Sequence, residues 1–224
     1  MLSLRGGSKA VELAGGKTLT LLRSASLDVS PGEIVAISGR SGSGKTTLLQ
    51  CLGLLDSFDH GTYVVDGINI AELSDRTQSE LRGRRFGFIF QQFHLLARRS
   101  AIANVMAPAQ HGTLAELRSS KARALDLLES VGLAERASAL PSQLSGGEQQ
   151  RVAIARSLIR DPLYVLADEP TGSLDPDTGE QVLRLLIGIC RRQSRALLLV
   201  SHDEAVSSRA DRRLRLVHGE IERR

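Results

Sequence analysis

The fold is decided by the stretch Gly39-Arg40-Ser41-Gly42-Ser43-Gly44-Lys45-Thr46-Thr47. The apolar run 34–37 before it is typical of a buried strand, and the run 48–52 after it is typical of the first turns of a helix. The glycines allow successive backbone N–H groups to turn inward around an anion, and the dipole at the start of a helix favours the same negative charge. The stretch therefore predicts a loop that holds phosphates between a strand and a helix.

Two side chains give this loop its expected chemistry. Lys45 is placed to reach the β- and γ-phosphates of a nucleotide, and the hydroxyl of Thr46 is placed to ligate Mg²⁺. The alternative is a glycine-rich turn that precedes Lys-Thr by chance. The rest of the chain decides between the two.

The composition is that of an ordinary globular protein. The chain has 224 residues, of which 42% are hydrophobic and 24% charged, and this allows one domain with a subdomain. Its aromatic residues are five phenylalanines and two tyrosines, so we expect a core of tightly packed aliphatic side chains.

The net charge of +4 does not indicate a nucleic-acid partner. The basic residues are nearly all arginines, they are spread along the chain, and they form no aromatic-interleaved patch of the kind that binds single strands. This charge is compatible with docking against the cytoplasmic face of a membrane protein.

The sequence favours a cytoplasmic protein. Met1–Gly7 lacks the apolar segment of a signal peptide, and no apolar run approaches the ~20 residues of a membrane helix. Cys51 and Cys190 lie far apart on predicted helices, which favours buried thiols in a reducing compartment over a disulfide or a metal site.

Strand and helix patterns alternate along the chain. Strands at 18–22 and 25–29 form an antiparallel lead-in, and 61–70 reads as a strand, a turn at Asp66-Gly67 and a short return that joins them. A polar helix at 74–85 and a strand at 86–90 precede a helical region at 101–159. Strands at 164–167 and 196–200 flank a helix at 178–192, and a C-terminal pair lies around 214–217 and 221.

The strand at 164–167 ends in two carboxylates, Asp168 and Glu169. Asp168 would hold Mg²⁺, and Glu169 would orient the water that attacks a γ-phosphate. Two exposed acids at a strand end are the alternative, which the phosphate-binding loop makes the weaker of the two. The pair predicts a nucleotide hydrolase.

The most specific stretch is Leu144-Ser145-Gly146-Gly147-Glu148-Gln149-Gln150-Arg151. Ser145, Gly146 and Gly147 open a helix and form a second N-terminal anion site. A glycine loop with a capping serine explains the local pattern, but it does not explain the whole string or its place just before Asp168-Glu169.

Six motifs in the family's order resemble the ATP-binding cassette (ABC) ATPases over nearly the whole chain. The Walker A loop is 39–47, the Q-loop residue is Gln91, the signature is 144–151, the Walker B strand is 164–169, the D-loop is 173–175 and the switch histidine is His202. The resemblance implies an α/β fold of the P-loop NTPase type, with an ABC-type ATPase core, an antiparallel β subdomain and a helical insert. It implies one domain over 1–224, with the core at about 1–91 and 161–224 and the helical subdomain at about 92–160.

The resemblance also implies the site. ATP and Mg²⁺ are the implied cofactors, and two copies pair head to tail on ATP binding. The catalytic residues are Glu169, His202 and Gln91, and the metal ligands are Thr46, Asp168 and Gln91. The ATP-binding residues are Gly39, Arg40, Ser41, Gly42, Ser43, Gly44, Lys45, Thr46 and Thr47, with Ser145, Gly146 and Gly147 from the other copy.

A finer resemblance is to the subfamily that serves lipoprotein release and macrolide export. It rests on 87–91, His94-Leu95-Leu96, the unbroken 144–155 and 167–175. Two departures stand out. Family members usually place an aromatic residue before the first long strand to stack on adenine, whereas Val11 or a neighbour fills that place here. The segment 97–105, in a region that commonly meets the membrane subunit, lacks the usual Pro and the Glu before Asn104.

The expected function is ATP hydrolysis that powers a separate integral membrane permease, with the chain peripheral on the inner face of the cell membrane. A regulatory switch that signals through a membrane partner without transport is the alternative. A soluble ABC protein of translation or DNA repair is disfavoured by the single cassette and the lack of a basic arm. His60, His94, His111 and His218 lack ligand-like spacing and receive no role.

Overall fold

The strand and the helix predicted around the phosphate-binding loop are both present. The structure, a computed structural model, describes residues 1–13 and 15–223. Strand β3 (Ile34–Ser38) precedes the loop and helix α1 (Lys45–Leu52) follows it. The chain divides into two compact units, 1–82 with 196–224, and 83–195. The first is called the loop unit and the second the signature unit, after the motifs that they carry.

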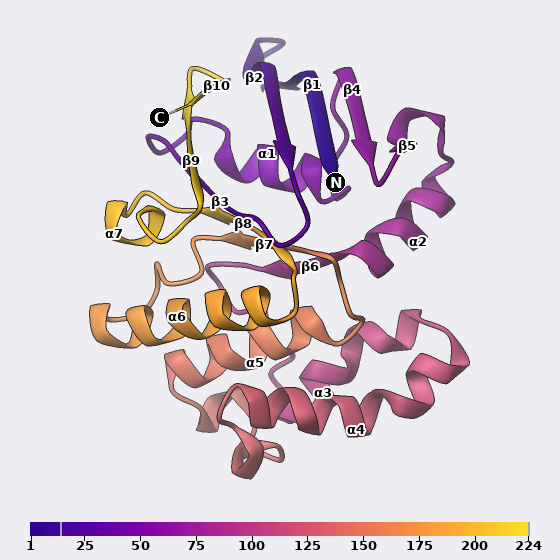
Figure 1. The fold of residues 1–224 in the computed structure, drawn as a ribbon, viewed down its shortest axis with the longest axis vertical. Helices are drawn as coiled ribbons and strands as arrows, with labels where there is room; N and C mark the ends of the chain where they lie inside the picture. Colours follow the sequence, from indigo (N-terminus) through magenta and orange to yellow (C-terminus); the bar gives the residue numbers. More distant parts are fainter. Residues whose placement is uncertain (14, 224) are drawn as a thin grey trace. The chain divides into compact units, whose positions relative to one another are not determined.

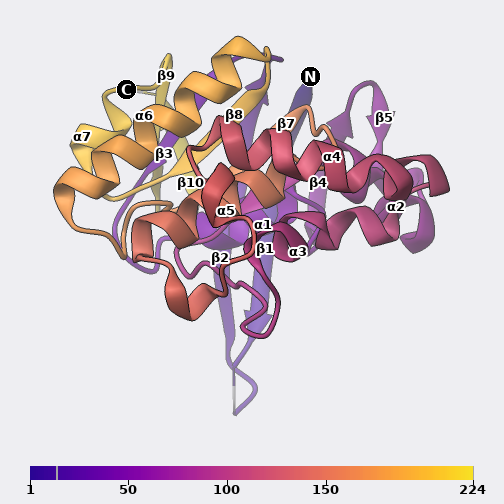
Figure 2. The same ribbon diagram turned by 90° about the horizontal axis from the view of Figure 1, so that it is seen from below.

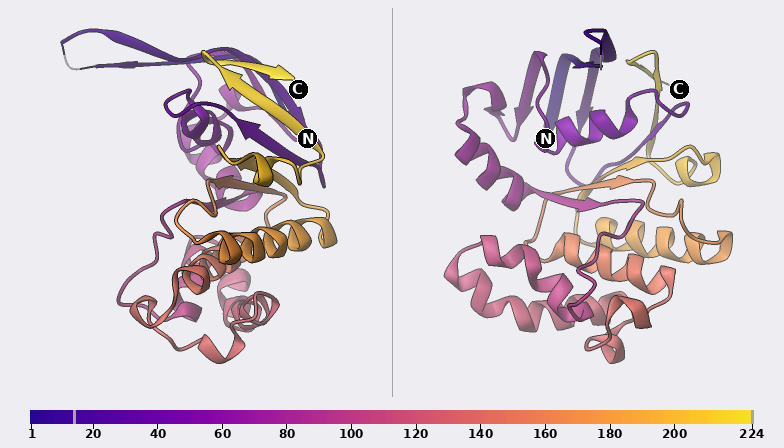
Figure 3. Two further views of the ribbon diagram at one scale, coloured as in Figure 1. Left: turned by 90° about the vertical axis from the view of Figure 1, so that its left-hand side faces the viewer. Right: turned by 180° about the vertical axis from the view of Figure 1, so that it is seen from behind.

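The loop unit contains an antiparallel sheet, as predicted (Figure 1). Strand β1 (Leu2–Glu12) pairs with β2 (Thr18–Val29) and with β4 (His60–Val65), and β4 pairs with β5 (Ile68–Asn69). Asp66 and Gly67 form the tight turn between β4 and β5, with φ angles of 51° and 83°. Strand β4 accompanies β1 as far as Ser8, and the β1–β2 hairpin continues beyond it (Figure 3).

The expected strands at 18–22 and 25–29 are one strand, β2. Ser24 lies between them with a φ of 88°, so the backbone bulges there and does not break. Strand β1, which the sequence patterns did not indicate, begins at Leu2 and absorbs Gly6 and Gly7 through shifts in register.

The loop unit also contains parallel strands. Strand β3 pairs in parallel with β8 (Ala196–Val200) and β9 (Arg212–Val217), and β10 (Glu220–Arg223) pairs antiparallel with β9. Residues 34–37 and all of β8 are buried, and the α1 side chains Leu48 and Leu52 are fully buried as well. Because parallel strands place their carboxyl ends at one edge, the residues after β3 and β8 lie close together. Helix α7 (Glu204–Ser207) follows β8.

The signature unit combines two parallel strands with helices. Strand β6 (Phe86–Ile89) pairs with β7 (Tyr164–Asp168). Helices α3 (Ala101–Met106), α4 (Leu114–Ser130) and α5 (Gly146–Leu158) pack on one another (Figure 2). Helix α6 (Pro176–Arg192) packs on α5. Helix α2 (Asp75–Arg85) begins in the loop unit, and its last residues, from Gly83, lead into β6. The helices expected within 92–160 are therefore present. The subdomain bounds at 92 and 160 stay a prediction, and the signature unit extends beyond them to β6, β7 and α6.

The aliphatic core expected from the composition is present in both units. Leu, Val, Ile and Ala make up most of the buried side chains, and Cys51 and Cys190 are buried free thiols. Across residues 1–13 and 15–223, no helix combines the length and the apolarity needed to cross a membrane.

Candidate functional site

The loop between β3 and α1 is shaped by glycine. Gly44 is the N-cap of α1 and has a φ of 95°, a conformation that L-residues rarely adopt. A Cβ at Gly44 would lie 2.6 Å from the carbonyl oxygen of Leu21 on β2, so the close approach of β2 excludes any larger residue. The N-terminus of α1 therefore opens directly into the loop, where N–H groups can meet an anion.

Lys45 lies inside this loop and is only 8% exposed. Its ammonium group donates hydrogen bonds to the carbonyl oxygens of Gly39 at 2.9 Å and Arg40 at 3.0 Å. The positive charge is thus held within the loop and not in bulk solvent. A phosphate in the loop would meet this charge together with the N–H groups at the start of α1.

His202 reaches the same loop from the end of β8. A cavity of about 450 Å³ is lined by His202, by the loop residues Gly39, Arg40 and Ser41, and by Ser38, Glu204, Ser207, Arg213 and Arg215. The Ser201 hydroxyl accepts from the N–H of Asp203 at 3.0 Å, and Asp203 caps α7. These bonds fix the backbone on either side of His202. The structure therefore brings the predicted switch histidine to the phosphate-binding loop.

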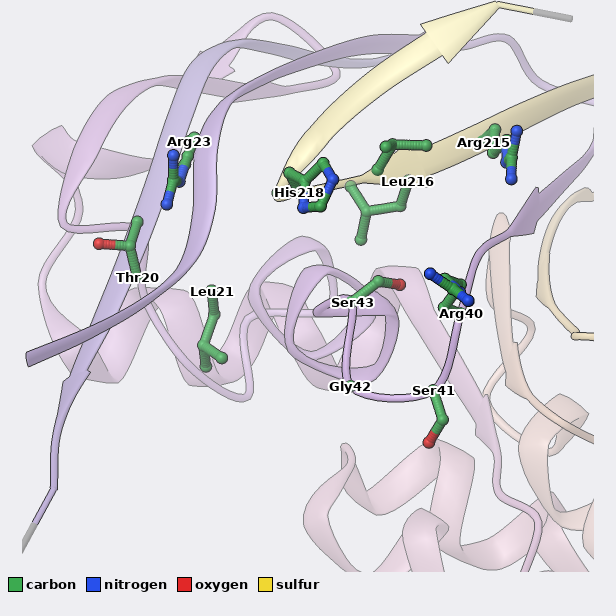
Figure 4. A pocket seen from close by; sticks show the side chains of 12 residues that line it. Thr20, Leu21, Arg23, Arg40, Ser41, Gly42, Ser43, Arg215, Leu216 and His218 are labelled. Carbon is green, nitrogen blue, oxygen red and sulfur yellow. The ribbon is translucent and has the colours of Figure 1, made fainter.

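A second cavity also adjoins the loop. It has a volume of about 410 Å³ and is lined by Arg40–Ser43, by Thr20, Leu21 and Arg23 of β2, and by Arg215–Gly219 around the β9–β10 turn (Figure 4). His218, which received no role from the sequence, faces this cavity.

In the signature unit, Gln91 and Glu169 come together at one point. A Cβ at Gly172 would lie 3.0 Å from Gln91 Nε2 and 3.2 Å from Glu169 Oε2, so both side chains converge on this glycine. The hydroxyl of Ser173 donates to the carbonyl oxygen of Gln91 at 3.1 Å. Two predicted catalytic residues from segments 78 positions apart are therefore neighbours.

The backbone at Glu169 is unusual. Its φ of 45° lies in the left-handed region, which for a residue other than glycine costs on the order of 1–3 kcal/mol. Such strain is found preferentially at functional sites, where the surrounding structure holds a side chain in one direction. Here it turns the Glu169 carboxylate away from the line of β7 and toward Gly172 and Gln91.

The signature stretch forms the start of α5. The hydroxyl of Ser145 accepts from the N–H of Glu148 at 3.3 Å, and the Glu148 carboxylate accepts from the N–H of Ser145 at 2.8 Å. The hydrogen bond from the Ser145 backbone lowers the pKa of Glu148 below its ordinary value. This capping box fixes the N-terminus of α5. A Cβ at Gly147 would lie 2.4 Å from Thr178 Cγ2, so α6 approaches as closely as the glycine permits.

Gln150 is a residue whose role the sequence did not reveal. Its side chain is fully buried on α5, and its amide Nε2 donates to the carbonyl oxygens of Pro170 at 2.5 Å and Phe90 at 3.5 Å. Phe90 precedes Gln91 and Pro170 follows Glu169. One amide thus joins the signature helix to both segments that carry the predicted catalytic residues. Its place within the signature string was the available signal, but its partners lie 60 and 20 residues away.

The predicted ligands are divided between the two units. The loop unit holds Gly39 to Thr47 and His202, and the signature unit holds Gln91, Asp168, Glu169 and Ser145–Gly147. Thr46, Asp168 and Gln91 offer oxygen donors, which Mg²⁺ prefers, and a site with a single carboxylate is usual when the substrate's phosphates complete the coordination. Over the described residues, no cluster of three His, Cys, Asp or Glu side chains offers a self-contained metal site. The donor set therefore fits Mg²⁺ bound together with a nucleotide, and the residue assignments stay predictions.

Comparison with known proteins gives one consistent answer. The family model described as ABC transporter matches residues 22–172. The lipoprotein-releasing system ATP-binding protein LolD of Hyphomonas neptunium is 45% identical over 99% of this chain and 96% of its own length. The macrolide export ATP-binding/permease protein MacB of Syntrophobacter fumaroxidans is 47% identical. That match covers 90% of this chain and 28% of the length of MacB.

The fold also matches a solved structure. A dimeric structure of the ATP-binding cassette MJ0796 in a post-hydrolysis state, bound to ADP and Pi, superimposes with a TM-score of 0.88. The two sequences are 37% identical, and the match covers 100% of this chain and 97% of the other.

Proposed function

We propose how this chain works from one premise, that it belongs to the ABC transporter family. It is the ATP-binding and ATP-hydrolysing subunit of a transporter. The family fixes the reaction, and the proposal concerns the residues that carry it out, the metal, the second copy and the membrane partner.

The phosphates of ATP bind in the loop of residues 39–47. Its N–H groups and the Lys45 ammonium hold the β- and γ-phosphates, because these donors already converge inside the loop. Thr46, Asp168 and Gln91 hold Mg²⁺, which when bound neutralises part of the phosphate charge. The ammonium group then exchanges its carbonyl partners for phosphate oxygens.

Glu169 orients and polarises the attacking water, and His202 donates to the γ-phosphate. The observation that carries this assignment is the convergence of Gln91 Nε2 and Glu169 Oε2 on Gly172, with Glu169 held at a φ of 45°. Gln91 is a neutral amide beside the carboxylate, so its Nε2 can donate to the water and its Oε1 can ligate the metal without competing for the proton.

Two copies pair head to tail when ATP binds. The N-terminus of α5 in one copy, at Ser145–Gly147, then caps the γ-phosphate held by Lys45 of the other, and so adds the N–H donors of a second helix start. A separate integral membrane permease holds the pair at the inner face of the membrane. The resemblance to LolD and MacB favours a permease of the kind that serves lipoprotein release or macrolide export.

Replacement of Glu169 tests the catalytic assignment. Glu169→Gln should lower ATP turnover by at least about 10²-fold, because the charge that polarises water is lost while the phosphate contacts remain. Size-exclusion chromatography with ATP and Mg²⁺ should then show a trapped dimer. Glu129→Gln, at an exposed glutamate on α4, is the matched control and should behave as wild type. Hydrolysis at the wild-type rate by Glu169→Gln would remove Glu169 from this role.

A further inference from the structure

The cavity beside β2 has the size and the position of a nucleotide subsite. Its volume of about 410 Å³ lies within the range of small-molecule sites, about 300–1,000 Å³. One border is the backbone of the loop at Arg40–Ser43. Since the ribose and base follow the phosphates covalently, a nucleotide whose phosphates occupy the loop must place its base in a space that adjoins it.

Two cavities adjoin the loop, and their linings differ in chemistry. The cavity that contains His202 is lined by serines, Glu204 and arginines, with glycine the only residue without a polar side chain. Both linings include Arg40, Ser41 and Arg215, and each cavity has one imidazole ring. The cavity beside β2 differs by its apolar residues Leu21, Leu216 and Val217, and its ring is that of His218. A base needs an apolar surface and a flat ring, whereas phosphates need cations and N–H donors. The second cavity therefore suits the base.

The backbone of the turn at His218 is held in place. His218 lies in the β9–β10 turn with a φ of 50°, in the left-handed region where histidine is one of the tolerated residues. The next residue, Gly219, accepts a hydrogen bond from the N–H of Arg23 on β2 at 2.8 Å. This bond ties the turn to β2, so that His218 and Leu21 stand on two sides of the same cavity (Figure 4).

Val11, where an aromatic residue was expected, lies elsewhere. It pairs with Leu19 in the β1–β2 hairpin, and the residues that line the cavity do not include it. The ring that lines this cavity, that of His218, comes from the opposite end of the sequence.

We propose that the base of the nucleotide binds in this cavity, packed between the imidazole of His218 and the side chain of Leu21, and that His218 supplies the flat surface that Val11 lacks. The inference deepens the proposed function and rests on it. It makes His218 a residue that binds the nucleotide without touching the phosphates.

The absence of tryptophan from the sequence allows a direct test. His218→Trp and Val11→Trp each introduce a single fluorophore at one of the two rival positions. A purine stacked on an indole ring quenches its emission, so ATP should quench His218→Trp saturably, while inorganic tripolyphosphate, which has no base, should not. Val11→Trp should respond to neither. Quenching of Val11→Trp by ATP, with none for His218→Trp, would overturn the proposal.

A second pair of variants keeps the test independent of the strain that tryptophan meets at this φ. His218→Asn keeps a residue that tolerates the left-handed region but removes the ring, and His218→Phe restores a ring. By calorimetry, His218→Asn should bind ATP about five- to tenfold more weakly than wild type, and its affinity for tripolyphosphate should be unchanged. His218→Phe should recover most of the loss.

The outcomes distinguish a failure of the proposed base site from a failure of the proposed function. Wild-type affinity for ATP in His218→Asn would contradict the base site but leave the ATPase intact. Equal losses for ATP and tripolyphosphate would also contradict it, because they would place His218 at the phosphates. If the wild-type chain bound neither ATP nor tripolyphosphate, the proposed function itself would be contradicted. Thermal melting of each variant identifies any that does not fold.

Discussion

At the scale of single residues, Gln150 links the segments of two predicted catalytic residues without being one of them. Gln150 is buried on α5, and its one amide donates to the carbonyls of Phe90 and Pro170, next to Gln91 and Glu169. Its Oε1 is buried without a hydrogen-bond partner among the described residues. We therefore expect Gln150 to position the two segments that carry the predicted catalytic residues Gln91 and Glu169.

Removal of this amide should lower the stability and the turnover of the protein more than its affinity for ATP. Gln150→Leu leaves the carbonyl of Pro170 buried without its donor, which should cost about 1–3 kcal/mol in the free energy of unfolding. In the folded enzyme kcat should fall more than the apparent affinity for ATP, since the phosphate-binding loop is untouched. Urea unfolding and steady-state ATPase measurements check both.

The control for this prediction is the neighbouring Gln149. Its amide donates to the carbonyl of Leu144 at the start of its own helix, at 3.1 Å. Gln149→Leu should therefore lower kcat much less than Gln150→Leu. Equal effects of the two variants would mean that Gln150 has no special connection to Gln91 and Glu169.

At the scale of elements, the end of α6 is tied to the start of β7. Arg195, 7% exposed, donates through Nη2 to Asp161 at 2.5 Å and through Nη1 to the carbonyl of Pro162. Asp161 also accepts from Arg123 of α4 at 3.0 Å. The hydrogen bond from Arg195 lowers the pKa of Asp161 below its ordinary value. One carboxylate thus links α4, β7 and the segment before β8.

The sign of this pKa shift predicts a dependence on pH. A depressed pKa contributes stability that is fully present above the ordinary carboxyl pKa and is lost as the pH falls through the folded value. Asp161→Asn, which tolerates the φ of 57° at this position, should lower the free energy of unfolding by about 1 kcal/mol near pH 6. Near pH 3 the difference should shrink. A difference that is constant in urea titrations at both pH values would contradict the role of the ionised carboxylate.

The elements that the sequence predicted best are those whose signal is local. The strand, loop and helix at 34–52 and the strand that ends in Asp168 follow from apolar runs, glycines and motifs within a few residues. The single strand β2 was not predicted, because Ser24 with its φ of 88° is compatible with a bulge only once β1 pairs beside it. Gln150 and His218 were missed for the same reason. Their neighbours come from other parts of the chain, and their roles depend on which strands lie side by side.

At the scale of the molecule, the segment after Gln91 is the candidate for contact with the permease. Leu96 is 51% exposed, and Arg98 and Arg99 are exposed as well. The segment is nevertheless held firmly. Asn104, fully buried, accepts from the N–H of Leu96 and donates to the carbonyls of Leu96, Arg99 and Ser100. An exposed apolar residue on a rigid segment suits a docking surface.

This segment is also connected to the signature helix. Arg156 of α5 donates to the carbonyl oxygens of His94 at 2.5 Å and Phe93 at 2.8 Å. A displacement of Phe93 and His94 by a bound membrane helix would therefore act on the helix that begins at Ser145–Gly147. Within the signature unit, the proposed docking segment and the proposed γ-phosphate cap share one rigid element.

Replacement of Leu95 and Arg98 together tests this docking surface, which Phe93, Leu96 and Arg99 also border. Leu95→Ser with Arg98→Ser should abolish most co-purification of the permease from membranes, because an apolar contact and a charge are both lost at the interface. Basal ATPase of the isolated subunit should be unchanged, because the loop of residues 39–47 and the convergence of Gln91 and Glu169 on Gly172 do not involve these side chains.

The matched control is Leu114→Ser with Arg118→Ser on α4, where Leu114 is 72% exposed, and it should retain the permease. Full recovery of the permease with the Leu95 and Arg98 variant would place the docking surface elsewhere, and loss of ATPase together with the permease would indicate misfolding, which a melting curve of the isolated subunit identifies.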